Sequence, residues 1–329
     1  MRLFSGKNAK IWYFANSYWQ LCLPAAWLRW RRTHILSKIS LRPDFKEIEE
    51  RVNYYCKDLH ASADQKQSWA SQFTALNKQK KVRPKVYYLD SFRYARWFSL
   101  DKKWNLCPGD VNYVPEIPSI VKSRPIGNDN QNGVLMKLDK VRHFVFLKDT
   151  LSWEQKKDMA IFRGAIGQKD NSLDFKKNRY DFLVKYFDHP MCDLGEVSKR
   201  GNYTNEAWKK PIISLYDHLK YKFILALEGN DVASNLKWVM SSNSIAVMPI
   251  PKYETWFMEG LLVPDYHYIA IADDYSDLEE KLQYYINHPE KAKEIIQHAH
   301  EWVEQFRDKK RETIISLRVL EKYFEQTNL

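Results

Sequence analysis

The stretch from Glu228 to Trp238 brings together groups that could bind a phosphate. It reads Glu-Gly-Asn-Asp-Val-Ala-Ser-Asn-Leu-Lys-Trp after a strongly apolar run, which is typical of a turn that leaves a strand and opens a helix. The start of a helix offers unpaired N–H groups and the positive end of the helix dipole. Ser234 and Asn235 add hydrogen-bond donors, and Lys237 adds a positive charge. The alternative is an ordinary strand–turn–helix capped by Asn or Asp.

Two arginines form a second candidate site. Arg163 stands beside Gly164 at the end of the apolar run 159–162, and Arg179 opens the helical run 176–187. Ligands of α/β sheets bind outside the carboxyl ends of the strands, and the guanidinium group suits bidentate contacts with phosphate. We therefore predict that both arginines bind an anion, with a pair of surface salt bridges as the alternative.

A third candidate lies in segment 103–133, whose four prolines and sparse apolar runs predict a long ordered loop. Asp110 follows Pro108-Gly109, and the tripeptide Lys122-Ser123-Arg124 comes later in the same segment. An aspartate held beside basic side chains could act as a general base near an anionic ligand. A simple turn aspartate is the alternative.

Several classes of site are excluded by motifs that the sequence lacks. Its ten glycines include no G-x-G pair and no G-x-x-x-x-G-K phosphate loop. Its four cysteines form no C-x-x-C pair, and their wide separation predicts free thiols. The sequence also has no D-x-D pair for Mg²⁺ or Mn²⁺. We therefore predict no metal and no bound cofactor, so protein cations would have to neutralise a leaving group.

The elements that must position these residues alternate along the chain. We expect strands at 86–89, 143–147, 159–162, 221–227, 244–248 and 268–272. We expect helices at 176–187, 231–241, 277–286, 291–306 and 313–324, and a capping box formed by Ser152 and Gln155. Strands separated by helices predict an α/β fold with parallel strands.

The net charge of +11 is concentrated at the N-terminus. Eight basic residues and no acidic residue precede Asp44, which leaves an excess of three for the rest of the chain. The same segment holds Trp12, Trp19, Trp27 and Trp30, and polar residues interrupt it too often for a spanning helix. Aromatic rings beside Arg and Lys are typical of an element in the headgroup layer of a membrane. The alternative is a core helix with a solvated basic turn; nucleic acid is disfavoured because no recognition motif accompanies the charge.

Taken in order, these pieces resemble glycosyltransferase family 90. This family includes fungal capsule-associated proteins, animal protein O-glucosyltransferases and bacterial lipopolysaccharide glycosyltransferases, and the resemblance is greatest to the bacterial branch. It runs from Asp110 to about Phe324. The motifs that carry it are Gly109-Asp110-Val111-Asn112, Lys122-Ser123-Arg124-Pro125-Ile126, Phe162-Arg163-Gly164, Asn178-Arg179, Lys220-Tyr221-Lys222 with Glu228–Trp238, Tyr253-Glu254-Thr255-Trp256, Pro264 with His267-Tyr268, and Ser276-Asp277-Leu278.

The resemblance implies a GT-B-like α/β fold with two Rossmann-like lobes and a cleft between them. We predict a basic aromatic membrane-surface segment at 1–43 and an acceptor-side lobe at 44–155. A nucleotide-sugar-binding lobe is expected at 156–306. The last helix, 307–329, would cross back onto the N-terminal lobe.

The resemblance also implies inverting, metal-independent transfer of a hexose or similar sugar from a nucleotide sugar, expected to be UDP-linked. Asp110 falls at the general base of the animal members. Animal and fungal members carry an arginine where this chain has Leu236, and we expect Lys237 to take over its charge. The predicted donor-binding residues are Arg163, Gly164, Arg179, Glu228, Gly229, Asn230, Ser234, Asn235 and Lys237, of which Arg163, Arg179 and Ser234 match donor-diphosphate positions. The candidate acceptor or phosphate contacts are Lys122, Ser123 and Arg124.

We predict that the acceptor is a lipopolysaccharide or lipooligosaccharide core. The protein would then be cytoplasmic and peripheral on the inner face of the cytoplasmic membrane. A protein acceptor, as in the animal relatives, is the first alternative, although no signal peptide is recognisable in the sequence. A non-catalytic polyanion-binding or nucleic-acid-binding protein is the second, and the nearly balanced charge after residue 43 disfavours it. The sugar, the base, the linkage and the oligomeric state are left open.

Overall fold

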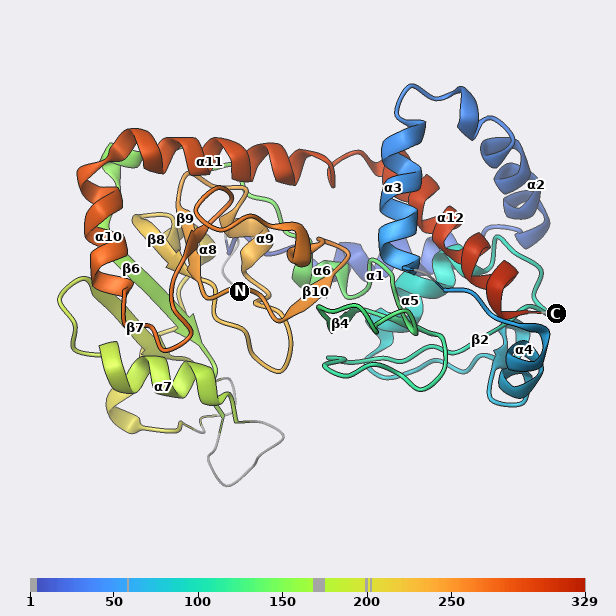
Figure 1. Cartoon of the computed structure of the whole chain (residues 1–329), viewed down its shortest axis with the longest axis horizontal. Coiled ribbons are helices and arrows are strands. Elements are labelled where there is room, and N and C mark those ends of the chain that lie inside the picture. Colours follow the sequence, from blue (N-terminus) through green and yellow to red (C-terminus); the bar gives the residue numbers. More distant parts are fainter. Residues whose placement is uncertain (1–4, 58, 168–174, 199–200, 202, 329) are drawn as a thin grey trace. The chain divides into compact units, whose positions relative to one another are not determined.

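Two groups of elements make up the chain, whose computed structural model describes residues 5–57, 59–167, 175–198, 201 and 203–328 (Figure 1). The sheet unit contains residues 5–8, Arg142–Lys252 and Glu259–Gln305. The helix-rich unit contains Ala9–Val141, Tyr253–Met258 and residues 306–328. The border between the units falls at residues 141 and 142, whereas the sequence pattern placed it at 155 and 156. Two segments from the C-terminal half also belong to the helix-rich unit.

The sheet unit is built on one five-stranded sheet whose paired strands are all parallel. Its spatial order is β11-β9-β8-β6-β7. The strands are β6 Lys157–Gly164, β7 Cys192–Glu196, β8 Tyr221–Leu225, β9 Ile245–Met248 and β11 Ile269–Ala270. The helices are α7 Lys177–Tyr186, α8 Leu215–His218, α9 Leu236–Val239, α10 Leu278–Asn287 and α11 Pro289–Glu304, with 3-10 turns at Trp153–Gln155, Glu206–Trp208 and Glu259–Leu261.

The central strands of the sheet unit are buried on both faces. Every residue of β8 and β9 is buried, as expected for a parallel sheet covered by helices. One sheet face packs against apolar residues of α7, α10 and α11. The expected strands at 159–162, 221–227, 244–248 and 268–272 are confirmed, with shorter ends in three of them. β7 is an additional strand, hidden in the sequence because Asp193 and Gly195 interrupt its apolar pattern.

The helix-rich unit surrounds three small sheets with helices. β1 pairs with β2 and β10 with β4 in antiparallel fashion, whereas β3 and β5 are parallel. The strands are β1 Thr74–Ala75, β2 Lys103–Trp104, β3 Ser119–Val121, β4 Ser123–Pro125, β5 Gly133–Leu135 and β10 Tyr253–Thr255. The helices are α1 Lys10–Leu21, α2 Ala25–Leu36, α3 Phe45–Cys56, α4 Ala63–Ala70, α5 Lys85–Ala95 and α12 Lys309–Thr327, with 3-10 turns at Ile39–Leu41 and Leu76–Lys78; α6 Lys140–His143 spans the border between the units.

Three expectations about the N-terminal half of the chain are wrong. Residues 86–89 lie in α5 and not in a strand, because their aromatic and branched side chains pack inward from a helix that contacts α1 and α12. Residues 144–147 form no strand, and segment 103–133 is not one loop but includes β2, β3, β4 and the start of β5. The α/β class is confirmed, but among the described residues the helix-rich unit has only two-stranded sheets, so a Rossmann-like description fits the sheet unit alone.

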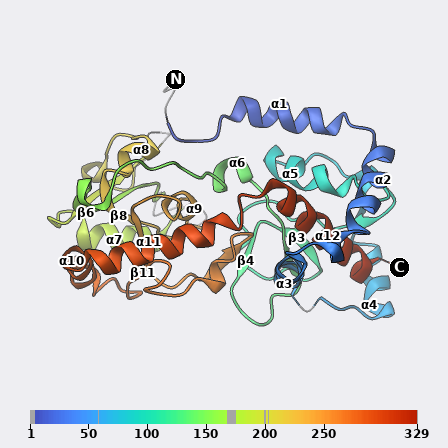
Figure 2. The same cartoon turned by 90° about the horizontal axis from the view of Figure 1, so that it is seen from above.

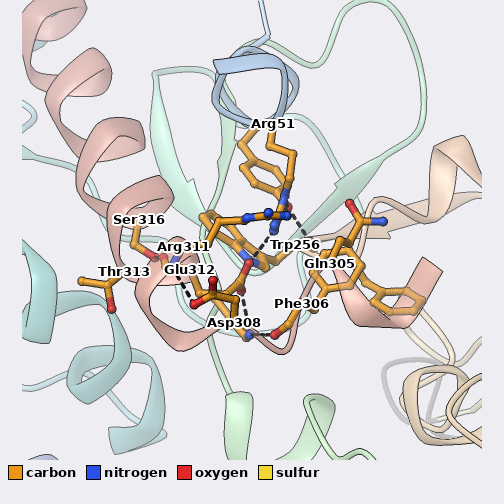
Figure 3. A network of polar contacts seen from close by, with 12 residues as sticks. Arg51, Trp256, Gln305, Phe306, Asp308, Arg311, Glu312, Thr313 and Ser316 are labelled. Carbon is orange, nitrogen blue, oxygen red and sulfur yellow. Dashed lines mark hydrogen bonds and ion pairs between the residues drawn. The ribbon is translucent and has the colours of Figure 1, made fainter. Parts of the chain in front are cut away.

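The last helix is held within the helix-rich unit by a buried charge cluster (Figure 3). α12 packs against α3 and α5, and Asp308 caps its first turn through the N–H groups of residues 310 and 311. The Glu312 carboxylate forms ion pairs with Arg51 and Lys137, each at 2.7 Å. It also accepts a hydrogen bond from the Trp256 indole N–H at 2.8 Å. Burial raises the pKa of Glu312, but the two cations outweigh burial, so its pKa lies below the ordinary value.

The N-terminal segment begins the helix-rich unit with two helices, α1 and α2, and residues 1–4 of the predicted membrane-surface segment lie outside the described residues. α1 packs against α5, and Figure 2 shows α1 running along the outer edge of the unit with α5 on its inner side. Among the described helices, none combines the length and the apolar character needed to cross a membrane.

Candidate functional site

The strand order of the sheet unit defines where a ligand is expected to bind. Counted in chain order, its strands lie in the sequence 2-1-3-4-5, with β6 first and β8 third. This is a doubly wound order, and its switch point lies between β6 and β8, where the connections leave in opposite directions. Ligands of such sheets bind beyond the carboxyl ends of the strands at that point. The predicted pair Arg163-Gly164 ends β6, and the predicted stretch Glu228–Asn235 follows β8.

Arg179 joins the two segments that leave the switch point. It lies in the first turn of α7, and its guanidinium donates to the carbonyl of Leu227 at 2.9 Å and to that of Ala165 at 3.0 Å. Its Nε also donates to the carbonyl of Glu228 at 3.1 Å. A side chain on Gly229 would start 3.0 Å from the Arg179 Nη2 atom, so glycine lets the guanidinium lie against the backbone.

Two side-chain amides hold the backbone of the polar loop that follows β8. Asn178 donates to the carbonyl of Glu228 at 2.7 Å, and Asn235 donates to the carbonyl of Leu225 at 2.9 Å. The helix expected over 231–241 is only the four-residue α9, so residues 228–235 form an extended turn. Ser234 is half-buried and Asn230 is exposed. Within the described residues no hydrogen bond involves the Ser234 hydroxyl, so this group is available to a ligand.

Arg163 approaches the switch point from the other face of the sheet. Phe162 packs into the core face, where Arg179 lies 5.8 Å from its ring, and the next side chain of a strand points the opposite way. The Arg163 guanidinium pairs with Asp193 of β7 at 2.6 Å. Burial raises the pKa of Asp193, but hydrogen bonds from Tyr221 and Arg163 outweigh it and leave the pKa below the ordinary value. The structure therefore separates the two predicted arginines.

Gly164 and Lys237 have structural roles that the sequence did not reveal. A Cβ on Gly164 would lie 2.4 Å from the Phe162 ring, so glycine makes room for that ring. Lys237 is completely buried and forms an ion pair with Glu259, which is itself only 1% exposed. In this structure the Lys237 ammonium points to a carboxylate in the interior, and its expected charge role toward a donor gains no support from the geometry.

Asp110 is positioned by strand β4 of the helix-rich unit. Gly109 adopts φ +108°, a backbone conformation that favours glycine, and thereby turns the chain into Asp110. The buried Lys122 ammonium forms an ion pair with the Asp110 carboxylate, which remains 24% exposed. Ser123 donates to the Val111 carbonyl at 3.0 Å and accepts from the Val111 N–H at 3.1 Å. The result is a partly accessible carboxylate that is ion-paired with Lys122 and follows a well-defined turn.

Arg124 is completely buried, and its guanidinium is bonded within the helix-rich unit. It is 0% exposed, and its Nε donates to Glu254 of β10 at 2.8 Å. Its other nitrogens donate to the carbonyls of Tyr54, Tyr55 and Gly133 at 2.8–3.0 Å. These bonds tie β4, β5 and the end of α3 together, so Arg124 supports strand β4, which begins with Ser123 directly after Lys122.

Four contributors were missed because they act through neighbours that are distant in the sequence. Asn178 and Asp193 hold the backbone and the arginine of the sheet unit, and Glu254 and Glu259 pair with buried cations. Asn178 and Glu254 stand in motifs of the family resemblance, and Asp193 is a charge within an apolar run, but none of these signals revealed the partner. Across the part of the chain that the structure describes, no group of three or more His, Cys, Asp or Glu side chains is arranged to hold a metal ion. Metal independence itself stays a prediction.

Comparisons with known proteins agree with the resemblance seen in the motifs. The family model described as Glycosyl transferase family 90 matches residues 135–326. The chain is 38% identical over 304 residues to O-glucosyltransferase LpsA of Dichelobacter nodosus, covering 92% of this chain and 91% of that protein. It is also 34% identical over 151 residues to protein O-glucosyltransferase 2 of Danio rerio, covering 44% of this chain and 28% of that protein. For protein O-glucosyltransferase 3 of Rattus norvegicus the identity is 26% over 181 residues, covering 53% of this chain and 33% of that protein.

Proposed function

The chain belongs to glycosyl transferase family 90 and is a glycosyltransferase, and from this premise we propose that it transfers a hexose or similar sugar from a nucleotide sugar to a lipopolysaccharide or lipooligosaccharide core. UDP is the expected nucleotide. The family membership speaks against the non-catalytic alternative, because that hypothesis explained only the net charge. The sugar donor and acceptor are the partners that the enzyme class requires.

The observation that carries the proposed mechanism is the Asp110 carboxylate. It is held by the ion pair with Lys122, and at 24% exposure the carboxylate can be reached by an acceptor hydroxyl. In the proposed step Asp110 accepts the hydroxyl proton while that oxygen attacks the anomeric carbon. The nucleoside diphosphate departs from the opposite face, so the configuration inverts. Lys122 acts as a positioning residue that holds the Asp110 carboxylate.

The proposed donor site is the switch point of the sheet unit. Arg179, the backbone of residues 228–230 and the Ser234 hydroxyl are the groups that we assign to the leaving diphosphate. Fixed donors aimed at a developing negative charge are typically worth roughly 3–4 kcal/mol each in the transition state. Arg163 remains a proposed donor contact, with its guanidinium held by Asp193. We reassign Lys237 to support of the loop through Glu259.

The acceptor part of the proposal is supported by the bacterial relative O-glucosyltransferase LpsA of Dichelobacter nodosus. A core saccharide anchored to lipid places the reaction at a membrane, so we propose a cytoplasmic enzyme that is peripheral on the inner face of the cytoplasmic membrane. A protein hydroxyl is the competing acceptor. It is supported by matches to animal protein O-glucosyltransferases, which cover a smaller part of the chain.

The deciding experiment replaces Asp110 by Asn and measures transfer and donor binding separately. Loss of a general base lowers the rate by roughly 10²–10⁴-fold, whereas binding of the nucleotide sugar should stay unchanged because Asp110 is assigned no donor contact. Asp129→Asn is the matched control, since it removes an exposed carboxylate from the same unit. Full activity of the Asp110→Asn enzyme would refute the assignment.

Donor and acceptor are identified in two successive assays. A panel of nucleotide sugars is screened by thermal shift, because a donor bound at 100 times its Kd stabilises the folded state by about 2.7 kcal/mol. The best donor is then offered with a lipid-free core oligosaccharide and with a serine-containing peptide. Transfer to the peptide alone would replace the core saccharide by the protein acceptor.

A further inference from the structure

Helix α1 turns its most apolar stripe away from the protein. Ile11, Trp12 and Trp19 are 70%, 77% and 68% exposed, and Tyr18 is also exposed. These positions follow helical spacing and therefore share one face. The opposite face holds the helix in place, because Tyr13 donates from its hydroxyl to buried Asp90 at 2.9 Å. The apolar and aromatic side chains of this stripe of α1 are therefore exposed to solvent.

Helix α2, the next helix of the chain, also exposes aromatic side chains. Trp30 is 65% exposed and stacks on His34, and Trp27 is exposed as well. The Arg31 guanidinium lies 5.1 Å from the centre of the Trp27 ring. Such pairs of aromatic ring and cation are enriched where one side of a side chain meets lipid and the other meets water.

A second basic run borders the stripe. Residues 65–89 contain no acidic residue, and their basic side chains are concentrated between Lys78 and Lys85. This run leads into α5, against which α1 packs. Its Lys81 ammonium lies 5.9 Å from the centre of the Tyr18 ring, which places the run beside the stripe. The tertiary structure therefore joins two basic segments that are separate in the sequence.

We propose that α1, α2 and residues 78–85 form one membrane-docking face for a bilayer with anionic headgroups. Tryptophan and isoleucine side chains would enter the boundary between headgroups and acyl chains, and the lysines and arginines would remain at the phosphates. A second copy of the chain is disfavoured as the occupant, because a two-fold contact would set this positive face against itself. The inference deepens the proposal of a lipid-linked acceptor and names the surface that would bring the enzyme to it.

The test is sedimentation of the full chain with vesicles of phosphatidylglycerol and phosphatidylcholine in equal parts, compared with phosphatidylcholine alone. We expect binding to the anionic vesicles that weakens with salt. Trp12→Ser with Trp19→Ser should lower the partition coefficient at least about tenfold, since two large apolar groups leave the interface. The control Tyr216→Ser with Tyr284→Ser removes two exposed aromatic rings from the sheet unit and should leave binding unchanged.

A second pair of variants tests the charge contribution. Lys80→Gln with Lys81→Gln should lower binding roughly 25-fold, because each lysine near an anionic surface contributes about fivefold. Lys309→Gln with Lys310→Gln removes two exposed lysines elsewhere in the same unit and should have little effect. Equal losses in test and control variants, or no vesicle binding by the unchanged chain, would overturn the proposal.

Two further measurements separate this inference from its rivals. A change from dimer to monomer in the Trp12→Ser, Trp19→Ser variant, without vesicle binding by the parent, would make the face a contact between copies and overturn the proposal. Transfer to the lipid-free core oligosaccharide is measured in parallel. If the unchanged chain does not transfer sugar to this acceptor, the result counts against the proposed function alone. If variants that have lost vesicle binding still transfer sugar to it, the docking face is separate from the catalytic machinery.

Discussion

The buried pair of Lys237 and Glu259 allows a sharp test, because two interpretations of Lys237 predict opposite results. If the pair is structural, replacing Lys237 by Met leaves a carboxylate in the interior. Both side chains are excluded from water, and removing one partner of a buried pair typically costs about 3–5 kcal/mol. If Lys237 instead serves the donor, its loss should weaken donor binding more than stability.

The cost should shrink when the second charge of the pair is removed as well. The double variant Lys237→Met, Glu259→Leu removes both charges and should recover most of the loss.

Hydrogen exchange of peptides from β8 and β9 measures the opening free energy of the sheet unit separately from the rest of the chain. Lys252→Met is the matched control, because Lys252 pairs with Asp273 at 3.2 Å while both side chains are mostly exposed, and such pairs are worth less than about 1 kcal/mol. Equal effects of Lys237→Met and Lys252→Met would refute the structural role. So would a double variant that regains stability but no longer binds donor.

Three more outcomes are expected. Arg179→Met should weaken nucleotide-sugar binding about 10- to 100-fold in calorimetry, as for a lost charged hydrogen bond, while neighbouring exposed Lys177→Met should not; equal losses would remove Arg179 from the site. Burial and the nearby His298 lower the pKa of His267 to about 4, so folded protein keeps this ring neutral where unfolded chain binds a proton. Stability should be complete above pH 6.5 and fall toward pH 4, and His267→Asn, which can still accept from the Val263 N–H, should flatten that fall in urea unfolding. Chelation by EDTA should leave the transfer rate unchanged; a loss restored by Mg²⁺ or Mn²⁺ would contradict metal independence.

The parts of the fold that could be predicted are those with strong local patterns. β9 is a continuous apolar run and β8 is apolar except for Lys222; both were predicted because a buried parallel strand needs mostly apolar side chains on both faces. The run Val86–Leu89 has the same local character yet forms part of α5. Short apolar runs fit either element, and only packing against α1 and α12 decides between them.

The candidate site divides in the same way. The residue types at Asp110, Arg179 and Ser234 predicted a base, a cation and a hydroxyl donor, and the structure leaves each of them half-buried or partly exposed at a chain turn or helix start. Lys237 and Arg124 looked equally suitable as charges, but the structure buries both against glutamates. A cation in the sequence does not reveal whether its partner is a ligand or a carboxylate far along the chain.

By itself, the sequence determined the α/β class, the positive and aromatic N-terminal segment and the positions of the motifs, because these depend on composition and on spacing of a few residues. The tertiary structure alone decided which charges are free to act. It paired Lys122 with Asp110 and Arg163 with Asp193, and it set residues 78–85 beside α1. Such pairings join residues that no periodic pattern connects, since they arise when the chain packs and each buried charge must meet a partner.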